Sequence, residues 1–190
     1  MESGELFESN ERQAQPGRGN EIKWRLVTNH QNMMFMISAG MILPPSGFGK
    51  KYYEDTLSLL SGWVPLFPEK LFQSAIDHSV SEQTLLRACY VEVDLTAVSG
   101  PVKLLRSGRW ENANFPDEVY GDEDLIIVPA PLPVSMVSEI VFSSKEDKSY
   151  CEKDAKNFSN VPLADFKTKS AATPFKKTKG GTWPPPLDGV

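Results

Sequence analysis

Hydrophobic and polar positions alternate most clearly within residues 85–95, from Cys89 to Leu95. A period of two is typical of a β-strand with one buried face, and residues 22–28 show a weaker form of it. Residues 125–128 are apolar without interruption, which predicts a buried strand. Shorter apolar runs predict further strands over 63–67, 102–105 and 140–142.

One segment has a helical period instead. The apolar residues between 33 and 37 recur at i, i+3 and i+4, which gives a helix one apolar stripe. Asn29 or Asn32 can cap its N-terminus, and Gly40 can stop it. We expect further short helices over 53–60 and 69–80, and one from a capping box at 143–146 to about Asn157. Short helices mixed with short strands predict an α+β fold.

The chain has 190 residues, which suits one domain, since a domain is typically about 100–200 residues long. Residues 1–21 have almost no large apolar side chains, so we expect a disordered polar tail. The domain is expected over 22–165. Residues 166–190 are rich in Lys, Thr, Gly and Pro, which predicts a flexible tail. This tail could link the domain to a partner or a further domain, or present Pro184–Pro186 for polyproline recognition.

Charge is unevenly distributed. The net charge is −5, while residues 1–21 carry −3 (five Glu, two Arg) and residues 166–190 carry +4 (five Lys, Asp188). Residues 22–165 therefore carry −6. An acidic domain is a poor generic binder of nucleic acid, because that binding depends on neutralising phosphates. The basic tail could supply some of this attraction, or simply stay solvated.

Cysteine and histidine usage argues against metal chemistry. The two cysteines, Cys89 and Cys151, lie far apart and in no CxxC arrangement, which favours a reducing compartment and no zinc site. The two histidines, His30 and His78, belong to no metal-binding motif. Neither a signal peptide nor an uninterrupted apolar span of about 20 residues is visible, so we expect a cytoplasmic protein without a membrane partner.

Two polar segments are candidates for chemistry. The loop 46–51 holds glycines and lysines without P-loop spacing, and it could contact a phosphate through backbone N–H groups or be a plain surface loop. Asp122, Glu123 and Asp124 stand together just before the apolar run 125–128. Such carboxylates could orient a ribose hydroxyl or stabilise a developing cation, and adjacent acids can raise one another's pKa. They could equally form a solvated turn.

Three blocks of sequence carry a resemblance to a known family. The first has the spacing T-x3-N-L-x2-I-L-x2-G-L, on Thr28, Asn32-Met33, Met36-Ile37 and Gly40-Met41. The second is residues 63–67, similar to Y-V-P-F-Y-F. The third is similar to A-E-V-L-V-P, I-P and I-x-V, over 124–129, 132–133 and 140–142. In this order the blocks resemble the DarT-like DNA ADP-ribosyltransferases, over about residues 22–142.

The resemblance implies an α+β fold of the ADP-ribosyltransferase type, a split of two small antiparallel sheets with flanking short helices. It implies NAD as co-substrate, no metal, a base in single-stranded DNA as acceptor, and a role in toxin–antitoxin or phage-defence systems. It places the catalytic carboxylate at Asp124, or at Glu123 if the register slips. The residues that it assigns to NAD binding are Thr28, His30, Lys51, Trp63 and Phe67.

The chain departs from the family pattern in the residues of the site. Family members begin H-I-T, where the histidine helps to bind the nicotinamide nucleotide, and this chain reads Leu26-Val27-Thr28. Lys50 and Lys51 are the nearest counterparts of a family arginine. Aspartate replaces glutamate at 124, and a misplacement of roughly 1 Å can cost about 100-fold in rate. Two functions stay open, a divergent transferase or a catalytically degenerate module that binds protein or nucleic acid.

Overall fold

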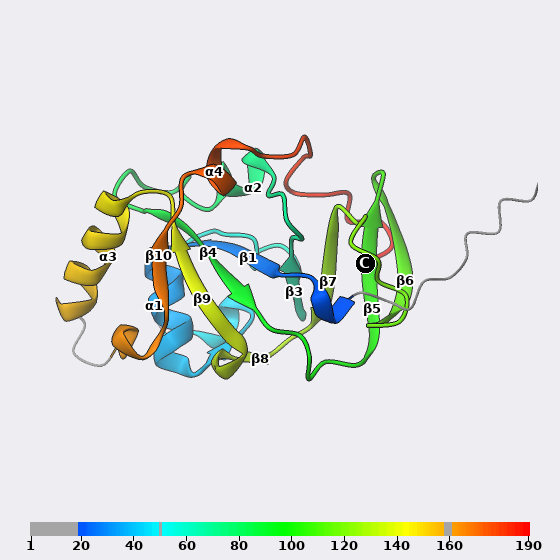
Figure 1. The fold of residues 1–190 in the computed structure, drawn as a ribbon, viewed down its shortest axis with the longest axis horizontal. Coiled ribbons are helices and arrows are strands. Elements are labelled where there is room, and N and C mark those ends of the chain that lie inside the picture. The colour runs from blue at the N-terminus through cyan, green and yellow to red at the C-terminus, as the bar shows by residue number, and fades with distance from the viewer. Residues whose placement is uncertain (1–18, 50, 158–160) are drawn as a thin grey trace, which may run out of the picture.

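The computed structural model describes residues 19–49, 51–157 and 161–190. Within them the chain forms two four-stranded sheets and a two-stranded one, flanked by short helices (Figure 1). The first sheet has the order β1 (Trp24–Asn29), β4 (Ala88–Val93), β9 (Val137–Phe142) and β10 (Thr168–Ser170). The second has the order β3 (Trp63–Leu66), β7 (Leu125–Pro129), β5 (Gly100–Arg106) and β6 (Arg109–Phe115). The α+β class predicted from the sequence is confirmed.

The strands pair antiparallel, with one exception. β10 runs parallel to β9, with Thr168 opposite Ile140. The small sheet pairs β2 (Met41–Ile42) with β8 (Leu132–Pro133). The two larger sheets approach each other where Arg25 of β1 and Phe67, just after β3, exchange backbone hydrogen bonds of 2.8 and 2.9 Å.

The continuous apolar run in β7 lies between two hydrophobic clusters. All four residues 125–128 have no exposed surface. Ile126 and Val128 join the cluster that packs under the first helix, whereas Leu125 and Ile127 join a second cluster on the opposite face. A strand buried on both faces explains why the run shows no alternation.

The helix predicted from the i, i+3, i+4 stripe is α1 (His30–Ala39). Asn29 caps it, since the Asn29 side chain accepts a 2.9 Å hydrogen bond from the Asn32 N–H. Gly40 ends it in the left-handed region with φ of 72°, where glycine has no side chain to strain. α3 (Lys145–Asn157) begins after Ser144, whose hydroxyl accepts from the Asp147 N–H. The other helical elements are α2 (Gln73–His78), α4 (Thr173–Lys176), and the 3₁₀ turns η1 (Gly19–Glu21), η2 (Pro45–Gly47), η3 (Val134–Met136) and η4 (Leu163–Asp165).

Two predicted helices differ from the structure. Residues 53–60 form turns, because the Asp55 carboxylate accepts the Leu57 N–H and the Ser58 hydroxyl accepts the Asp55 N–H. Such local bonds to the backbone compete with a helix. The helix predicted over 69–80 is shorter, as α2. The edge strand β6 was not predicted, because only Ala113 and Phe115 of its residues are buried.

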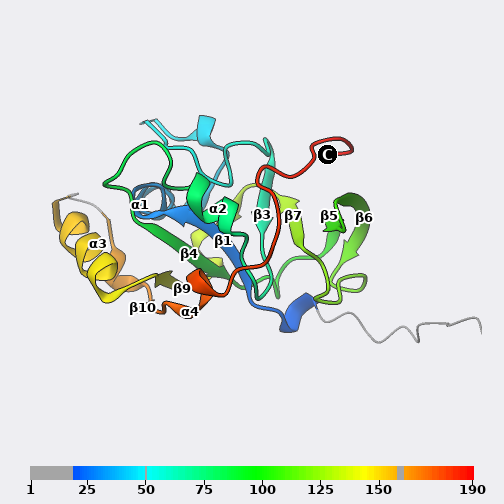
Figure 2. The ribbon, with the colours of Figure 1, turned by 90° about the horizontal axis from the view of Figure 1, so that it is seen from above.

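The two terminal segments differ in what the structure describes. Residues 1–18 of the predicted polar tail lie outside the described residues, and its last three form η1, where Gly19 accepts a 2.9 Å hydrogen bond from the Trp24 indole. The flexibility expected over 166–190 stays a prediction; the structure places this segment along the domain as β10, α4 and an extended run (Figure 2). Phe175 and Trp183 pack against the second hydrophobic cluster, which overall composition could not reveal. Among the described residues, no helix is long and apolar enough to cross a membrane.

Candidate functional site

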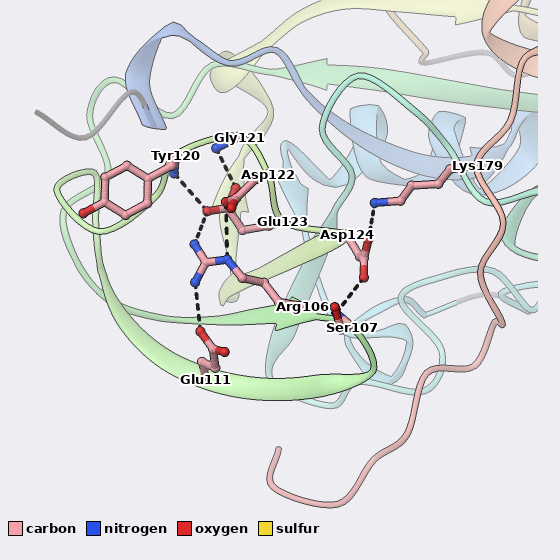
Figure 3. Close-up of polar contacts among 9 residues, drawn as sticks. All are labelled: Arg106, Ser107, Glu111, Tyr120, Gly121, Asp122, Glu123, Asp124 and Lys179. Carbon is pink, nitrogen blue, oxygen red and sulfur yellow. Dashed lines mark hydrogen bonds and ion pairs between the residues drawn. The ribbon is translucent and has the colours of Figure 1, made fainter. Parts of the chain in front are cut away.

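The acid cluster that precedes β7 divides in two, because Glu123 and Asp124 point in different directions (Figure 3). The Glu123 carboxylate is buried and accepts hydrogen bonds from the backbone N–H groups of Tyr120 and Gly121, at 2.9 and 2.7 Å. It also pairs with the Arg106 guanidinium at 2.6 Å. Every contact of Glu123 therefore closes its own turn or fixes Arg106.

Arg106 is the centre of this turn. It contacts Glu111 at 2.8 Å and Asp122 at 3.3 Å in addition to Glu123. Desolvation would lower the pKa of Arg106, but the bond to Glu111 and the charges of Glu123 and Asp122 raise it above its usual value. A buried carboxylate that lost this partner would be strongly unfavourable. The arrangement makes Glu123 a structural residue of the turn.

Asp124 lies on the other side of the strand and is more accessible. Its backbone N–H donates to the Leu105 carbonyl at 2.9 Å, which extends the pairing of β5 with β7. Its carboxylate accepts the Ser107 N–H at 3.1 Å and forms an ion pair with Lys179 of the C-terminal segment. The two charged side chains are 21% and 39% exposed. An ion pair this exposed is weak and can be replaced by another partner.

Thr28 lies in a different cluster, in which Thr28, Asn32 and Asp55 have no exposed surface. Its hydroxyl donates to Asp55 at 2.6 Å, and the same carboxylate oxygen accepts from the Asn32 amide at 3.0 Å and from the Tyr52 hydroxyl at 2.6 Å. Leu57 donates its N–H to the second oxygen at 2.9 Å. Burial raises the pKa of Asp55, while these donors act to lower it. We call these side chains the Asp55 cluster.

The sequence did not single out Asp55, although it indicated two of its partners. The spacing T-x3-N places Thr28 and Asn32 on either side of the start of α1, where both reach the same carboxylate. The Asn32 side chain also binds the Tyr53 backbone, through the carbonyl at 2.7 Å and the N–H at 3.0 Å. In this chain the motif therefore fastens the segment after residue 51 to β1 and α1.

His30 is also buried, with 1% of its surface exposed. Its Nδ1 accepts the Arg87 N–H at 3.0 Å, so the proton of the neutral ring is on Nε2, which is 3.3 Å from Asp154 of α3. Burial lowers the pKa of His30, and the Asp154 charge opposes that shift. Both ring nitrogens have partners within the protein, and they tie α1 to α3 and to the residue before β4.

The remaining predicted residues lie nearer the surface or nearer Asp124. Lys51 is exposed, with Nζ 4.9 Å from the centre of the Tyr53 ring. Trp63 begins β3 half-buried, and Phe67 is fully buried, with its ring 5.9 Å from that of Trp183. Because β3 pairs antiparallel with β7, Phe67, just after β3, and Asp124, just before β7, flank the same end of this strand pair. Thr28 and His30 are at the opposite end of β1 from the Arg25–Phe67 bridge.

The loop 47–49 borders a cavity of about 220 Å³ against α1, lined by Met34, Phe35 and Phe48. The Phe48 ring stacks on Tyr52 with centroids 4.8 Å apart. This stack connects the cavity to the Asp55 cluster through the Tyr52 hydroxyl. Among the described residues, no group of three or more His, Cys, Asp or Glu is placed to hold a metal ion.

Comparison with known proteins gives a structural likeness. No family model and no curated protein matches the chain. DarT of Thermus sp. 2.9 in complex with NAD+ is similar with a TM-score of 0.58 and 13% identity, over 85% of this chain and 100% of that chain. The same protein in complex with ADP-ribosylated ssDNA gives 0.55 and 14%, over 80% and 95%. DarTG of Thermosipho africanus in complex with ADP-ribose gives 0.52 and 14%, over 80% and 50%.

These values establish a DarT-like fold for the described chain. At identities of 13–14% they show the fold alone. The fold expectation drawn from the three sequence blocks is thereby supported at the level of the overall fold, and the roles of the individual residues rest on the geometry described above.

Proposed function

We propose that the chain is a divergent ADP-ribosyltransferase, which transfers ADP-ribose from NAD to a base in single-stranded DNA. The observation that carries this proposal is the position of Asp124. It is a partly accessible carboxylate at the start of β7, beside the point where the two larger sheets approach each other. The similar folds of proteins bound to NAD+ and to ADP-ribosylated ssDNA support the same reaction class.

In this proposal NAD lies in the split between the two sheets. Lys51 and the loop 47–49 would hold the dinucleotide, through backbone N–H groups and a positive charge. Thr28 would act indirectly, because it fastens this segment through Asp55. Trp63, which is half-buried, would border the nicotinamide, and Phe67, which has no exposed surface, would act only through packing. His30 would position α1 and not touch the co-substrate.

Asp124 would act on the ribose. As the bond between ribose C1′ and the nicotinamide nitrogen breaks, positive charge develops on the ribose and nicotinamide leaves with the bonding electrons. A nitrogen of the base then forms the new bond to C1′ and loses its proton to solvent. A fixed carboxylate stabilises that transition state more than the ground state, because the charge appears only as the bond breaks. We assign this role to Asp124 and not to Glu123, whose carboxylate is occupied by Arg106 and its own turn.

The buried positions of Thr28 and His30 favour a second candidate, a catalytically degenerate module. In it the fold would contact a protein or nucleic acid, in part through residues 166–190, without turnover. The two candidates differ in NAD binding. We expect the purified chain to bind NAD in a calorimetric titration and to modify a single-stranded oligonucleotide, detected as a mass increase of one ADP-ribose. Absence of both would leave the binding module as the better description.

A further inference from the structure

The C-terminal residues 179–187, which we call the strap, cross from the first sheet to the second. Before the strap, β10 pairs with β9 of the first sheet. At its far end, Trp110 of β6 donates its indole N–H to the Pro186 carbonyl at 2.5 Å. Close beyond it, Lys103 of β5 donates to the Gly189 carbonyl at 2.7 Å. The strap therefore spans the region where the two larger sheets meet (Figure 2).

Trp183 is the buried anchor of the strap. Its side chain is 6% exposed and packs in the cluster that contains Phe67 and Phe72. Ser74 of α2 binds the backbone of the strap beside Trp183. The Ser74 hydroxyl accepts the Trp183 N–H at 2.8 Å and donates to the Gly181 carbonyl at 3.0 Å. A Cβ on Gly181 would lie 2.6 Å from the Phe72 ring, so a side chain there would force this ring to move.

The position of Lys179 is set by its own backbone contacts and by the docking of Trp183 nearby. The Lys179 N–H donates to the Leu71 carbonyl at 2.8 Å, and residue 179 forms a bridge with Phe72. Only three residues separate Lys179 from Trp183, so a docked indole keeps the lysine over β7. From there its ammonium reaches Asp124, the candidate catalytic carboxylate (Figure 3).

The contacts that hold the strap are weak enough for it to detach from the domain. Trp183 and Pro185 are its buried residues, while Lys179 is half-buried and the others are exposed. Among the described residues, the buried Trp183 Nε1 has no hydrogen-bond partner, which weakens docking because this donor loses its water. The Lys179–Asp124 pair is itself exposed enough to be displaced.

We propose that Phe67, Phe72, Ser74 and Trp110 form a docking surface for a Trp–Pro peptide, and that the strap is its resident occupant. When the strap is docked, it inhibits the candidate catalytic carboxylate, because Lys179 then neutralises the charge of Asp124. We call this inhibition the closing role of the strap. A neutralised carboxylate stabilises a developing ribose cation less well. Aromatic side chains that hold a proline-rich segment are a recurring mode of peptide recognition. The closing role rests on the proposed transferase function, whereas the docking itself does not.

Two full-length variants and a control test this proposal. Trp183→Ala removes the anchor, and Lys179→Met removes the charge while keeping most of the side-chain length. Lys177→Met is the control, because Lys177 is an exposed lysine of the same segment. Each chain is measured for amide hydrogen exchange of residues 179–183 and 187, since the prolines at 184–186 have no backbone N–H. Each is also measured for NAD binding by calorimetry and for transfer to an oligonucleotide.

We expect Trp183→Ala to speed exchange in the strap by about 10-fold or more, because a buried anchor is lost. Both test variants should increase transfer by about 5-fold or more, while NAD affinity stays equal or rises, since an ion pair on the acid is removed. Lys177→Met should match the wild type in all three measurements. If amide hydrogen exchange in Trp183→Ala equals that of the wild type, the docking proposal is wrong.

The remaining outcomes separate the two proposals. If NAD binds and transfer is unchanged or lower in Lys179→Met, the closing role is wrong, and Lys179 belongs to the productive arrangement of the site. If neither the wild type nor any variant binds NAD, the transferase proposal is wrong and the closing role with it. Faster exchange in Trp183→Ala would then still support the docking surface.

Discussion

Two carboxylates that organise polar contacts in this fold, Asp55 and Asp124, are held in opposite ways. Asp55 has no exposed surface and accepts hydrogen bonds from four donors, each from a residue fixed by β1, α1 or the adjoining turn. Asp124 is partly exposed and is held by one backbone N–H and a lysine 55 residues away. In a low-dielectric interior a fully satisfied network is rigid, whereas a surface ion pair exchanges partners readily.

This difference separates the residues of the family pattern into two that hold a buried carboxylate and one whose own carboxylate is accessible. Thr28 and Asn32 match the pattern, and their side chains are used to hold Asp55. Asp124 departs from the pattern by one methylene and still has an accessible carboxylate. Residues that preserve a motif can therefore maintain the fold, while the residue that we propose as the catalytic acid is one that has changed.

The largest expected effect is on the Asp55 cluster. Asp55→Asn keeps the size of the side chain but replaces one acceptor oxygen with an amide N–H donor, and this donor then faces groups that are themselves donors. We expect the free energy of unfolding to fall by about 3 kcal/mol, because buried donors lose their acceptor. Urea unfolding followed by circular dichroism measures it. Tyr52→Phe is the graded companion and should cost less, since it removes one donor only. Equal stability of Asp55→Asn and the wild type would mean that this cluster is open to water.

Asp124 should show the reverse behaviour, with an effect on rate and little on stability. Asp124→Asn keeps the shape of the side chain and removes the charge. We expect transfer to an oligonucleotide to fall by about 100-fold or more while NAD binding stays within a few-fold, the scale for one preorganised electrostatic contact. Asp122→Asn is the control, because Asp122 is an exposed acid of the same cluster. A transferase whose activity survives Asp124→Asn would have its catalytic acid elsewhere.

The contrast between the clusters also explains what the sequence could predict. Local periodicity and end signals predicted α1 and its Gly40 stop, and the apolar run predicted β7; these are confirmed. The sequence left the cap open between Asn29 and Asn32, and the structure has Asn29. Neither Asp55 nor the strap has such a signal. Asp55 meets Thr28 across 27 residues and Lys179 meets Asp124 across 55, and polar contacts at those separations leave no periodic pattern.

Composition could not predict the contacts of the C-terminal segment for a related reason. A segment rich in Lys, Gly and Pro has too little apolar surface, on average, to offset its ordering entropy. The average hides one tryptophan whose partners, Phe67 and Phe72, lie more than a hundred residues earlier in the chain. The docking of Trp183 therefore depends on tertiary contacts that composition does not contain.

The stability of the fold should also depend on pH through the buried His30 ring. Burial lowers the pKa of this ring in the folded chain, while the charges of Asp154 and Asp147 oppose the shift and that of Arg87 adds to it. The unfolded chain then binds the proton more tightly than the folded one. Stability should be complete above the ordinary histidine pKa of about 6.5 and decline as pH falls toward the lower folded value. His30→Gln should flatten this decline in urea titrations between pH 5 and pH 7.5, and an unchanged slope would assign it to other groups.

The smallest expected effect is that of Lys179→Met on stability, and it completes the contrast. Both side chains of its ion pair with Asp124 are partly exposed, and pairs of this kind contribute about 0–1 kcal/mol. The Lys179 backbone bonds to Leu71 do not depend on the side chain, so the strap keeps that contact in the variant. The unfolding midpoint in urea should therefore stay close to that of the wild type, and added salt should reduce even this difference, because salt screens exposed charges. Unfolding curves at low and at physiological ionic strength measure both. If Lys179→Met lowers the free energy of unfolding as much as Asp55→Asn does, the Asp124 pair is a buried structural contact. The two regions would then no longer differ in the way they hold their carboxylates.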